Sequence, residues 1–370
     1  MGSLLDGLPK DAHVEIITTL PNRYSSFSRE APELESHPGL TVRRVKLSEH
    51  HSGMLDQARA FAYFAYNVIR LTKKSEYQLV IGTSSRLMTA VLSAYVARRK
   101  KVPLYLDIRD IFVDTIGDIL SKKLAVIFKP IFIFLERFAI KRAAKVNLVS
   151  FGFKEYFSTR YPDQQFSFFT NGVDEEFLDE KLKLTALPPR EEQDKEVTVL
   201  YAGNIGEGQG LHAIIPELAK RLEGRVRFRL IGDGGRRCVL ESKLKEMGCD
   251  NVELLPPVNR SVLIREYQNA DVLFLHLNSY PAFEKVLPSK LFEYAAMGKP
   301  VWAGLSGYSA NFVKEEIENA ALFMPCDVGA AVASFEKLAI EEVDRAAFIR
   351  KFARKNIMRR MVKDILSLAS

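Results

Sequence analysis

The feature that most constrains this 370-residue sequence is an alternation of short apolar runs with longer helix-period runs, which occurs twice. The first series has strand-like runs at 13–18, 78–82, 103–108, 145–150 and 166–169, separated by helical patterns at 55–73, 86–99 and 122–144. The second series has strand-like runs at 197–202, 226–231, 251–255, 271–276, 300–303 and 321–323. Such alternation predicts an α/β protein with two doubly wound, Rossmann-like domains built on parallel sheets.

The two series are separated by residues 182–196, which combine Pro188 and Pro189 with many charged residues. The predicted organisation is an N-terminal domain at 1–185, a linker at 186–196, a second domain at 197–343 and a basic C-terminal helix at 344–370. Two such domains would face each other across a ligand cleft beside the carboxyl ends of their strands.

The start of the chain departs from this pattern. Residues 4–9, with Gly7 and Pro9, are typical of the last turn of a helix. Doubly wound domains usually open with a strand and a glycine-containing loop, so we expect the first strand and most of the first helix of the N-terminal domain to be missing from this chain.

Composition excludes several classes of protein. The three cysteines have no metal-ligand spacing, so we expect neither a disulfide framework nor a metal site. The longest apolar stretch, 124–135, is interrupted by Lys129 and Pro130, and it is too short to span a bilayer. A net charge of +7 favours an acidic partner. No base-reading motif accompanies that charge, and we expect no nucleic acid.

Positive charge is concentrated in two segments. Residues 122–145 contain seven basic residues and one acidic residue, Glu136, among large apolar side chains. This composition is typical of a helix lying in an anionic membrane interface, although the solvated face of a core helix has the same composition. Residues 345–364 contain eight basic residues and predict an amphipathic helix packed along the protein.

Two glycine-dense turns follow strands of the second series. The first contains Gly203, Asn204 and Gly206, and the second contains Gly234 and Arg236. Glycines allow backbone amides to approach an anion at the start of a helix. Neither turn has the Walker A or dinucleotide-binding spacing. We expect both turns to face one crevice, and the alternative is a pair of ordinary tight turns.

A third element is the segment 283–300. Pro288 and Ser289 suit the start of a helix, where free amides and Lys290 would attract a phosphate. Glu293 falls one turn later, where a carboxylate can accept hydrogen bonds from both hydroxyls of a ribose. The alternative interpretation is an ordinary capped helix with a surface glutamate.

Together, the runs at 201–206, 231–234, 288–300 and 171–174 resemble retaining glycosyltransferases of family 4, which have the GT-B fold. The similarity is greatest to bacterial enzymes of O-antigen or capsule synthesis, including N-acetyl-fucosamine transferases. It implies an acceptor-side first domain and a second domain that binds a UDP-sugar. It also implies transfer to a lipid-linked or glycan acceptor at the cytoplasmic face of the membrane, with no metal and no cofactor.

The sequence departs from that family at specific positions. The first glutamate of the family's Glu-x7-Glu motif corresponds to Lys285, and the basic residues of the glycine loop correspond to Asn204 and Gln209. Lys285, Lys290 or Arg236 would supply the missing charge.

The segment at 106–110 resembles the region where the family carries a His-Asp pair. We therefore expect Arg109 and Asp110, together with Lys285, to be catalytic, unless Arg109 and Asp110 form a structural ion pair.

Two other functions remain open at this level. One is a GT-B-like sugar-nucleotide epimerase. The other is a non-catalytic nucleotide-binding or scaffold subunit, which the departures at Lys285, Asn204 and Gln209 favour.

Overall fold

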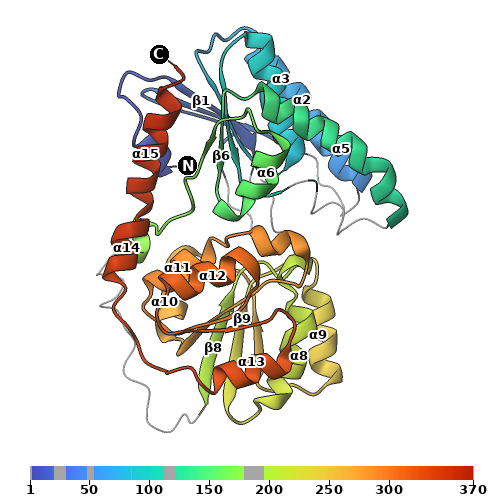
Figure 1. Ribbon diagram of the computed structural model, residues 1–370, viewed down its shortest axis with the longest axis vertical. Coiled ribbons are helices and arrows are strands. Elements are labelled where there is room, and N and C mark those ends of the chain that lie inside the picture. The colour runs from blue at the N-terminus through green and yellow to red at the C-terminus, as the bar shows by residue number, and fades with distance from the viewer. Residues whose placement is uncertain are drawn as a thin grey trace. The chain divides into compact units, whose positions relative to one another are not determined.

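The computed structural model describes residues 2–20, 31–47, 54–84, 86–111, 113, 122–178 and 196–369. The chain divides into two compact units: Met1–Thr170 with Met358–Ser370, and Asn171–Ile357 (Figure 1). This division differs from the sequence-based boundaries at 185 and 343. The predicted linker, 186–196, lies outside the described residues except for Glu196.

The first unit contains two sheets. Its elements are α1 (Gly2–Leu5), β1 (Val14–Thr19), β2 (Leu34–His37), β3 (Leu40–Val45), α2 (Met54–Thr72), β4 (Val80–Ser84), α3 (Leu87–Lys100), β5 (Leu104–Ile108), α5 (Lys122–Arg142), β6 (Lys145–Leu148), η1 (Phe151–Phe153), α6 (Lys154–Arg160) and β7 (Phe166–Ser167). Among the described residues, β4, β5, β6 and β7 form a parallel sheet in that order, and β1, β3 and β2 form a second sheet. The strand β2 is antiparallel to β3, and the sequence pattern did not predict either of these two strands.

Helices α2, α3 and α5 lie side by side in the first unit (Figure 1). The helix α5 runs through Pro130 as a single element. Its one acidic residue, Glu136, is buried and accepts hydrogen bonds from the hydroxyls of Tyr156 and Tyr161. The described exposed face of α5 therefore carries basic and apolar side chains.

The C-terminal segment returns to the first unit. It forms α14 (Ala346–Phe352), which belongs to the second unit, and α15 (Arg354–Leu366), which belongs to the first unit from Met358 onward. The apolar face of α15 is buried at Ile357, Met358, Met361, Val362 and Ile365. The segment predicted as one amphipathic helix is therefore two helices, of which α15 has the predicted amphipathic character. Asp364 accepts a hydrogen bond from the buried hydroxyl of Tyr105 at 3.1 Å and pairs with the ammonium of Lys145. Because of these contacts, residues 358–370 belong to the first unit, whereas the sequence predicted a separate C-terminal helix at 344–370.

The second unit has six parallel strands in the order β10-β9-β8-β11-β12-β13 among its described residues. Its strands are β8 (Val197–Ala202), β9 (Val226–Ile231), β10 (Val252–Leu255), β11 (Val272–His276), β12 (Val301–Gly304) and β13 (Ala320–Phe323). Its other elements are η2 (Glu175–Leu178), η3 (Glu207–Gln209), α8 (Leu211–Arg221), α9 (Arg237–Glu246), α10 (Arg260–Asn269), η4 (Pro281–Lys285), α11 (Lys290–Ala296), α12 (Gly307–Glu316) and α13 (Val328–Phe335).

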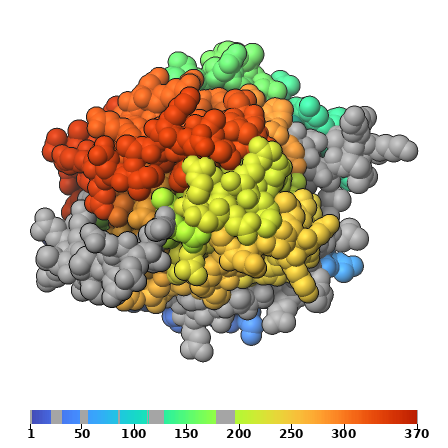
Figure 2. Space-filling view, turned by 90° about the horizontal axis from the view of Figure 1, so that it is seen from below, coloured from blue at the N-terminus to red at the C-terminus, as the bar shows by residue number. Residues whose placement is uncertain are grey.

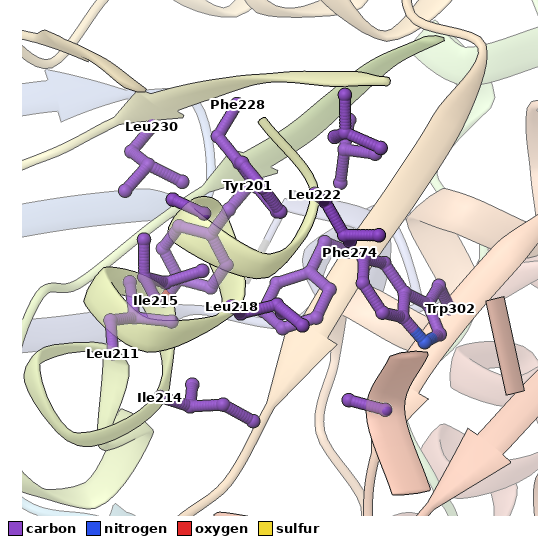
Figure 3. Packing of buried hydrophobic residues seen from close by; sticks show 14 of the residues in the cluster. Tyr201, Leu211, Ile214, Ile215, Leu218, Leu222, Phe228, Leu230, Phe274 and Trp302 are labelled. Atoms are coloured by element: carbon purple, nitrogen blue, oxygen red, sulfur yellow. The ribbon is translucent and has the colours of Figure 1, made fainter. Parts of the chain in front are cut away.

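The core of the second unit lies between the sheet and the helices α8, α9 and α13. Helix α8 buries an apolar stripe at helical spacing, which packs on side chains of the sheet such as Phe228, Phe274 and Trp302 (Figure 3). The ring of Trp302 lies 5.1 Å from that of Phe274. Figure 2 shows α13 in orange-red beside α8 in yellow-green, on the outside of this core. The core fixes the carboxyl ends of β8, β9 and β11, from which the candidate site is built.

Candidate functional site

The two glycine-dense turns of the second unit pack directly against each other. The amide of Gly203 donates to the carbonyl of Ile231 at 2.8 Å, and the amide of Ile205 donates to that of Asp233 at 2.8 Å. A Cβ on Gly232 would lie 1.8 Å from the carbonyl oxygen of Gly203, so only glycine allows this approach. Gly234 has the same role, because a Cβ there would lie 2.6 Å from the carbonyl oxygen of Ile205.

In the loop after β8, residues 203–210, most carbonyl groups accept hydrogen bonds from the protein. They accept hydrogen bonds as follows: Asn204 from the Tyr201 hydroxyl, Ile205 from the Arg236 amide, Glu207 from the Asn278 side chain, Gly208 from the Asn278 amide and Gln209 from His276. Within the described part of the chain, no acceptor meets the amides of Asn204, Gly206, Glu207 and Gly208. A loop with occupied carbonyls and unoccupied amides suits an anion.

Lys290 brings positive charge to this loop. A Cβ on Gly203 would lie 2.3 Å from Cε and 2.7 Å from Nζ of Lys290, so the lysine side chain lies directly over the glycine. Lys290 begins α11, directly after Pro288 and Ser289. The amides of the next two residues, 291 and 292, donate to the carbonyls of Pro288 and Ser289 at 3.2 and 3.1 Å. The expectation that the first turn of α11 offers free amides is therefore wrong for these two.

The carboxylate of Glu293 is held by a buried tyrosine. The hydroxyl of Tyr267 donates to Oε2 of Glu293 at 3.1 Å, and the Tyr267 ring lies edge-on to Tyr294 at 5.3 Å. The Tyr294 hydroxyl accepts from the amide of Ala202, at the end of β8. Burial raises the pKa of both tyrosines, so both keep their protons. This arrangement fixes Glu293 relative to the strand that leads into the glycine loop.

The side chains of Asn204 and Gln209 are hydrogen-bonded to each other. Nδ2 of Asn204 donates to Oε1 of Gln209 at 2.8 Å. Arg236 forms an ion pair with Glu207, which also accepts a hydrogen bond from the Tyr280 hydroxyl at 2.7 Å. The Tyr280 hydrogen bond and Arg236 lower the pKa of Glu207. The charge of Arg236 is therefore partly neutralised by Glu207.

His276 is a site residue that the sequence analysis missed. It ends β11, is fully buried, and lies between the Gln209 carbonyl at 2.7 Å and the Cys326 amide at 2.9 Å. Burial lowers its pKa to about 4, so it is neutral at physiological pH. The signal in the sequence was a polar residue at the end of a predicted buried strand, next to Asn278.

Arg109 and Asp110 follow β5 in the first unit, whereas Gly203 and Lys290 belong to the second unit. Nε of Arg109 donates to the buried carboxylate of Asp107 at 3.0 Å and to the Thr83 hydroxyl at 3.2 Å. The carboxylate of Asp110 accepts from the Ile111 amide at 3.0 Å, and burial raises its pKa to about 6. The structural partner of Arg109 is thus Asp107 rather than Asp110.

Lys285 ends η4, a few residues before α11. The adjacent Glu284 packs against Gly307, since a Cβ on Gly307 would lie 2.2 Å from the carbonyl oxygen of Glu284. Within the described ranges, no group of three or more His, Cys, Asp or Glu side chains could hold a metal ion. Nor does any helix in those ranges have the length and apolarity needed to cross a bilayer.

Residues 185–356, which include the glycine loop and α11, match the family model described as "Glycosyl transferases group 1". This segment is therefore similar to the group 1 glycosyltransferase domains, and the match covers less than half of the chain. Part of the chain also aligns in sequence with a protein from Escherichia coli (strain K12), WcaI, which is provisionally named a colanic acid biosynthesis glycosyl transferase. The two are 29% identical over 179 residues, and the alignment spans 46% of this chain and 44% of WcaI, less than half of either.

Solved structures extend the similarity to the whole chain. Sucrose-phosphate synthase (tll1590) from Thermosynechococcus elongatus superposes with a TM-score of 0.66 at 16% identity, over 100% of this chain and 88% of that one. Anabaena Alr3699/HepE in complex with UDP gives a TM-score of 0.59 at 17% identity, over 88% and 86% of the respective chains. The fold of the chain is that of the GT-B glycosyltransferases.

Proposed function

We propose that this protein is a glycosyltransferase that moves a sugar from a UDP-sugar to a lipid-linked or glycan acceptor in surface polysaccharide synthesis. The observation that carries the proposal is the loop 203–210, whose unoccupied amides lie beside Lys290. A diphosphate is the anion that fits such a loop, and Glu293 is placed one turn along α11 to bind a ribose. The UDP complex of HepE supports UDP as the nucleotide of the donor. The name of WcaI supports a role in polysaccharide synthesis.

The proposed chemistry is a retaining transfer. Gly203, Asn204, Gly206 and Lys290 stabilise the departing diphosphate through fixed dipoles and charge, an effect that contributes several kcal/mol in enzymes. We assign no protein nucleophile. The acceptor attacks from the face that the diphosphate leaves, and a phosphate oxygen takes its proton. Membership of family 4 and an N-acetylated donor sugar belong to the same proposal and rest on the motif at 288–300.

Three further residues receive catalytic roles in this proposal. Lys285 occupies the position of the family's sugar-contacting glutamate and contacts the donor. Arg109, held by Asp107, and Asp110, with its pKa raised to about 6, act on the acceptor side. A carboxyl with a pKa near the working pH suits proton transfer.

We also propose that the first unit binds an anionic membrane, at the cytoplasmic face where a lipid-linked acceptor resides. Among the side chains of α5 that the structure describes, the exposed ones are Lys129, Pro130, Ile131, Ile133, Phe134, Arg137 and Lys141. Phe134 is 69% exposed, which is unusual for a phenylalanine on a solvated helix. Since Glu136 points into the core, this face combines cations and apolar groups without an acidic side chain.

A non-catalytic nucleotide-binding subunit is the second candidate. The hydrogen bond between Asn204 and Gln209 favours it, because a neutral pair occupies the positions where the family has basic residues. Transfer assays with UDP-sugars separate the two candidates, since a binding subunit retains UDP without turning over a donor.

The proposed donor site is tested by calorimetry with UDP and uridine. Lys290→Ala should lower the affinity for UDP by about tenfold or more, which is the scale of a lost charged hydrogen bond. The affinity for uridine should be nearly unchanged. Lys220→Ala is the matched control, because Lys220 pairs with Glu223 at the other end of α8. Equal losses for UDP and uridine would remove Lys290 from the diphosphate site.

A further inference from the structure

Three successive carbonyls of the glycine loop are held by residues from the end of β11. Asn278 donates its side-chain amide to the Glu207 carbonyl at 3.0 Å and its backbone amide to the Gly208 carbonyl at 2.8 Å. His276 engages the carbonyl of Gln209 at 2.7 Å. No other described segment holds three consecutive loop carbonyls, so the orientation of these peptide groups depends on β11.

The hydrogen bonds fix the tautomer of His276. The amide of Cys326 donates to Nε2 at 2.9 Å, so Nε2 carries the lone pair and Nδ1 carries the proton. Nδ1–H therefore donates to the Gln209 carbonyl. Each imidazole nitrogen has one partner of the correct kind, and a flipped ring would lose both.

Packing prevents the imidazole from moving. Its ring packs against those of Phe274 and Phe323, with centroids 6.3 and 6.1 Å away, and these two rings also contact each other. A Cβ on Gly304 would lie 2.3 Å from Cδ2 of His276, so the neighbouring strand β12 is also in contact with the ring. A rigid donor at this position holds the Gln209 peptide more firmly than a solvent-exposed side chain could.

We propose that His276 is a positioning residue for the donor diphosphate: with Asn278, it holds the carbonyls of Glu207, Gly208 and Gln209 inward so that the loop amides face the phosphates. This inference rests on the proposed function. His276 does not touch the ligand. It acts through the loop, and its effect should appear in phosphate binding rather than in binding of the nucleoside.

Two conservative variants separate the two hydrogen bonds of the imidazole. His276→Asn places an amide nitrogen at the position of Nδ1 and can keep the bond to the Gln209 carbonyl. His276→Gln places an amide oxygen near the position of Nε2 and can keep the bond to the Cys326 amide. UDP and uridine affinities are measured by calorimetry for both variants, with melting temperatures recorded alongside.

We expect His276→Gln to lower the affinity for UDP by about tenfold, which is the range of one hydrogen bond. The affinity of His276→Asn for UDP should stay within about threefold of the wild type. Uridine affinity should be the same in all three proteins. Equal UDP affinity in the wild type and both variants would overturn the inference, and so would parallel losses of UDP and uridine that follow the melting temperature.

The remaining outcomes are also decisive. If His276→Gln does not fold, Asn278→Ala, which removes the side-chain bond to the Glu207 carbonyl, is judged by the same criteria. If the wild type binds UDP but the variants do not discriminate UDP from uridine, the positioning role fails and the proposed function stands. If the wild type binds neither ligand, the proposed function fails and the inference fails with it.

Discussion

Glu293 illustrates how a buried neighbour defines a candidate ligand-binding side chain. The carboxylate belongs to α11, but its position depends on the hydroxyl of Tyr267, which comes from α10. A carboxylate held in one position loses less conformational freedom on binding a ribose than a mobile surface glutamate would.

Replacing Glu293 with Ala should make the free energy of UDP binding less favourable by about 1.5–3 kcal/mol, which is the range for a hydrogen bond to a charged group. The same change leaves the buried Tyr267 hydroxyl without its acceptor, so the melting temperature should also fall. Tyr267→Phe is the control, because it removes the hydroxyl and keeps the carboxylate. Calorimetry should show a clearly larger loss for the Glu293 variant, and equal losses would count against a ribose contact.

At this scale the sequence predicted the residues that stand at glycine turns and helix starts, because local motifs mark them. Lys290 was predicted at the anion site and does lie over Gly203. The sequence could not show that Arg236 pairs with Glu207, or that His276 supports the loop, because both depend on contacts between segments distant in the chain. The role of each residue in binding remains a prediction.

At the scale of elements, the helix α5 is the surface through which we propose that the first unit binds a membrane. A helix whose only acid is buried against two tyrosines exposes a face suited to anionic headgroups, with Phe134 available to the acyl boundary.

Replacing Lys129, Arg137 and Lys141 together with Gln should weaken binding to anionic vesicles by about 3 kcal/mol, at about 1 kcal/mol for each basic residue near the surface. The matched control changes the same net charge elsewhere, at the exposed residues Lys220, Arg227 and Lys245 of the second unit. Vesicle sedimentation at low and high salt measures the effect. Equal binding of the two triple variants would contradict a membrane role for α5.

The elements of the second unit were predicted more completely than those of the first. All six predicted strands of the second series are present, since buried parallel strands form continuous apolar runs. In the first unit, β2 was missed because a four-residue exposed strand paired antiparallel at a sheet edge has no such run. The central strand β3 was missed because Thr41, Arg43 and Arg44 interrupt its apolar residues. Helix α5 was predicted, but the burial of Glu136 depends on tyrosines from the following segment.

Across the whole molecule, Asp110 in the first unit and His276 in the second respond to acid in opposite directions. The pKa of Asp110 in the first unit is raised from 3.8 to about 6, so its favourable contribution to stability is present at low pH and is lost as pH rises through 6. The pKa of His276 in the second unit is lowered from 6.5 to about 4, so its contribution is present above pH 6.5 and is lost as pH falls toward 4.

Each group can therefore change the stability of its unit by up to about 3 kcal/mol, in opposite directions, between pH 4 and 7. Trp302 is the single tryptophan and is buried in the second unit, so its fluorescence reports that unit. Its urea midpoint should fall on acidification in the wild type and fall much less in His276→Asn, whereas Asp110→Asn should leave this change intact. A wild-type midpoint that does not respond to pH would contradict the assignment of a neutral, buried His276.

The return of residues 358–370 to the first unit has a consequence for the order in which the protein matures. The ribosome completes the second unit, Asn171–Ile357, before it makes residues 358–370. In the folded protein this last segment buries its own Met361 and Ile365, and its Asp364 contacts Tyr105 and Lys145. The unit whose synthesis begins first is thus the last to close, and until then it exposes the apolar surface that α15 will cover. A nascent chain of this kind should depend on holding chaperones for its N-terminal half rather than for the half made later.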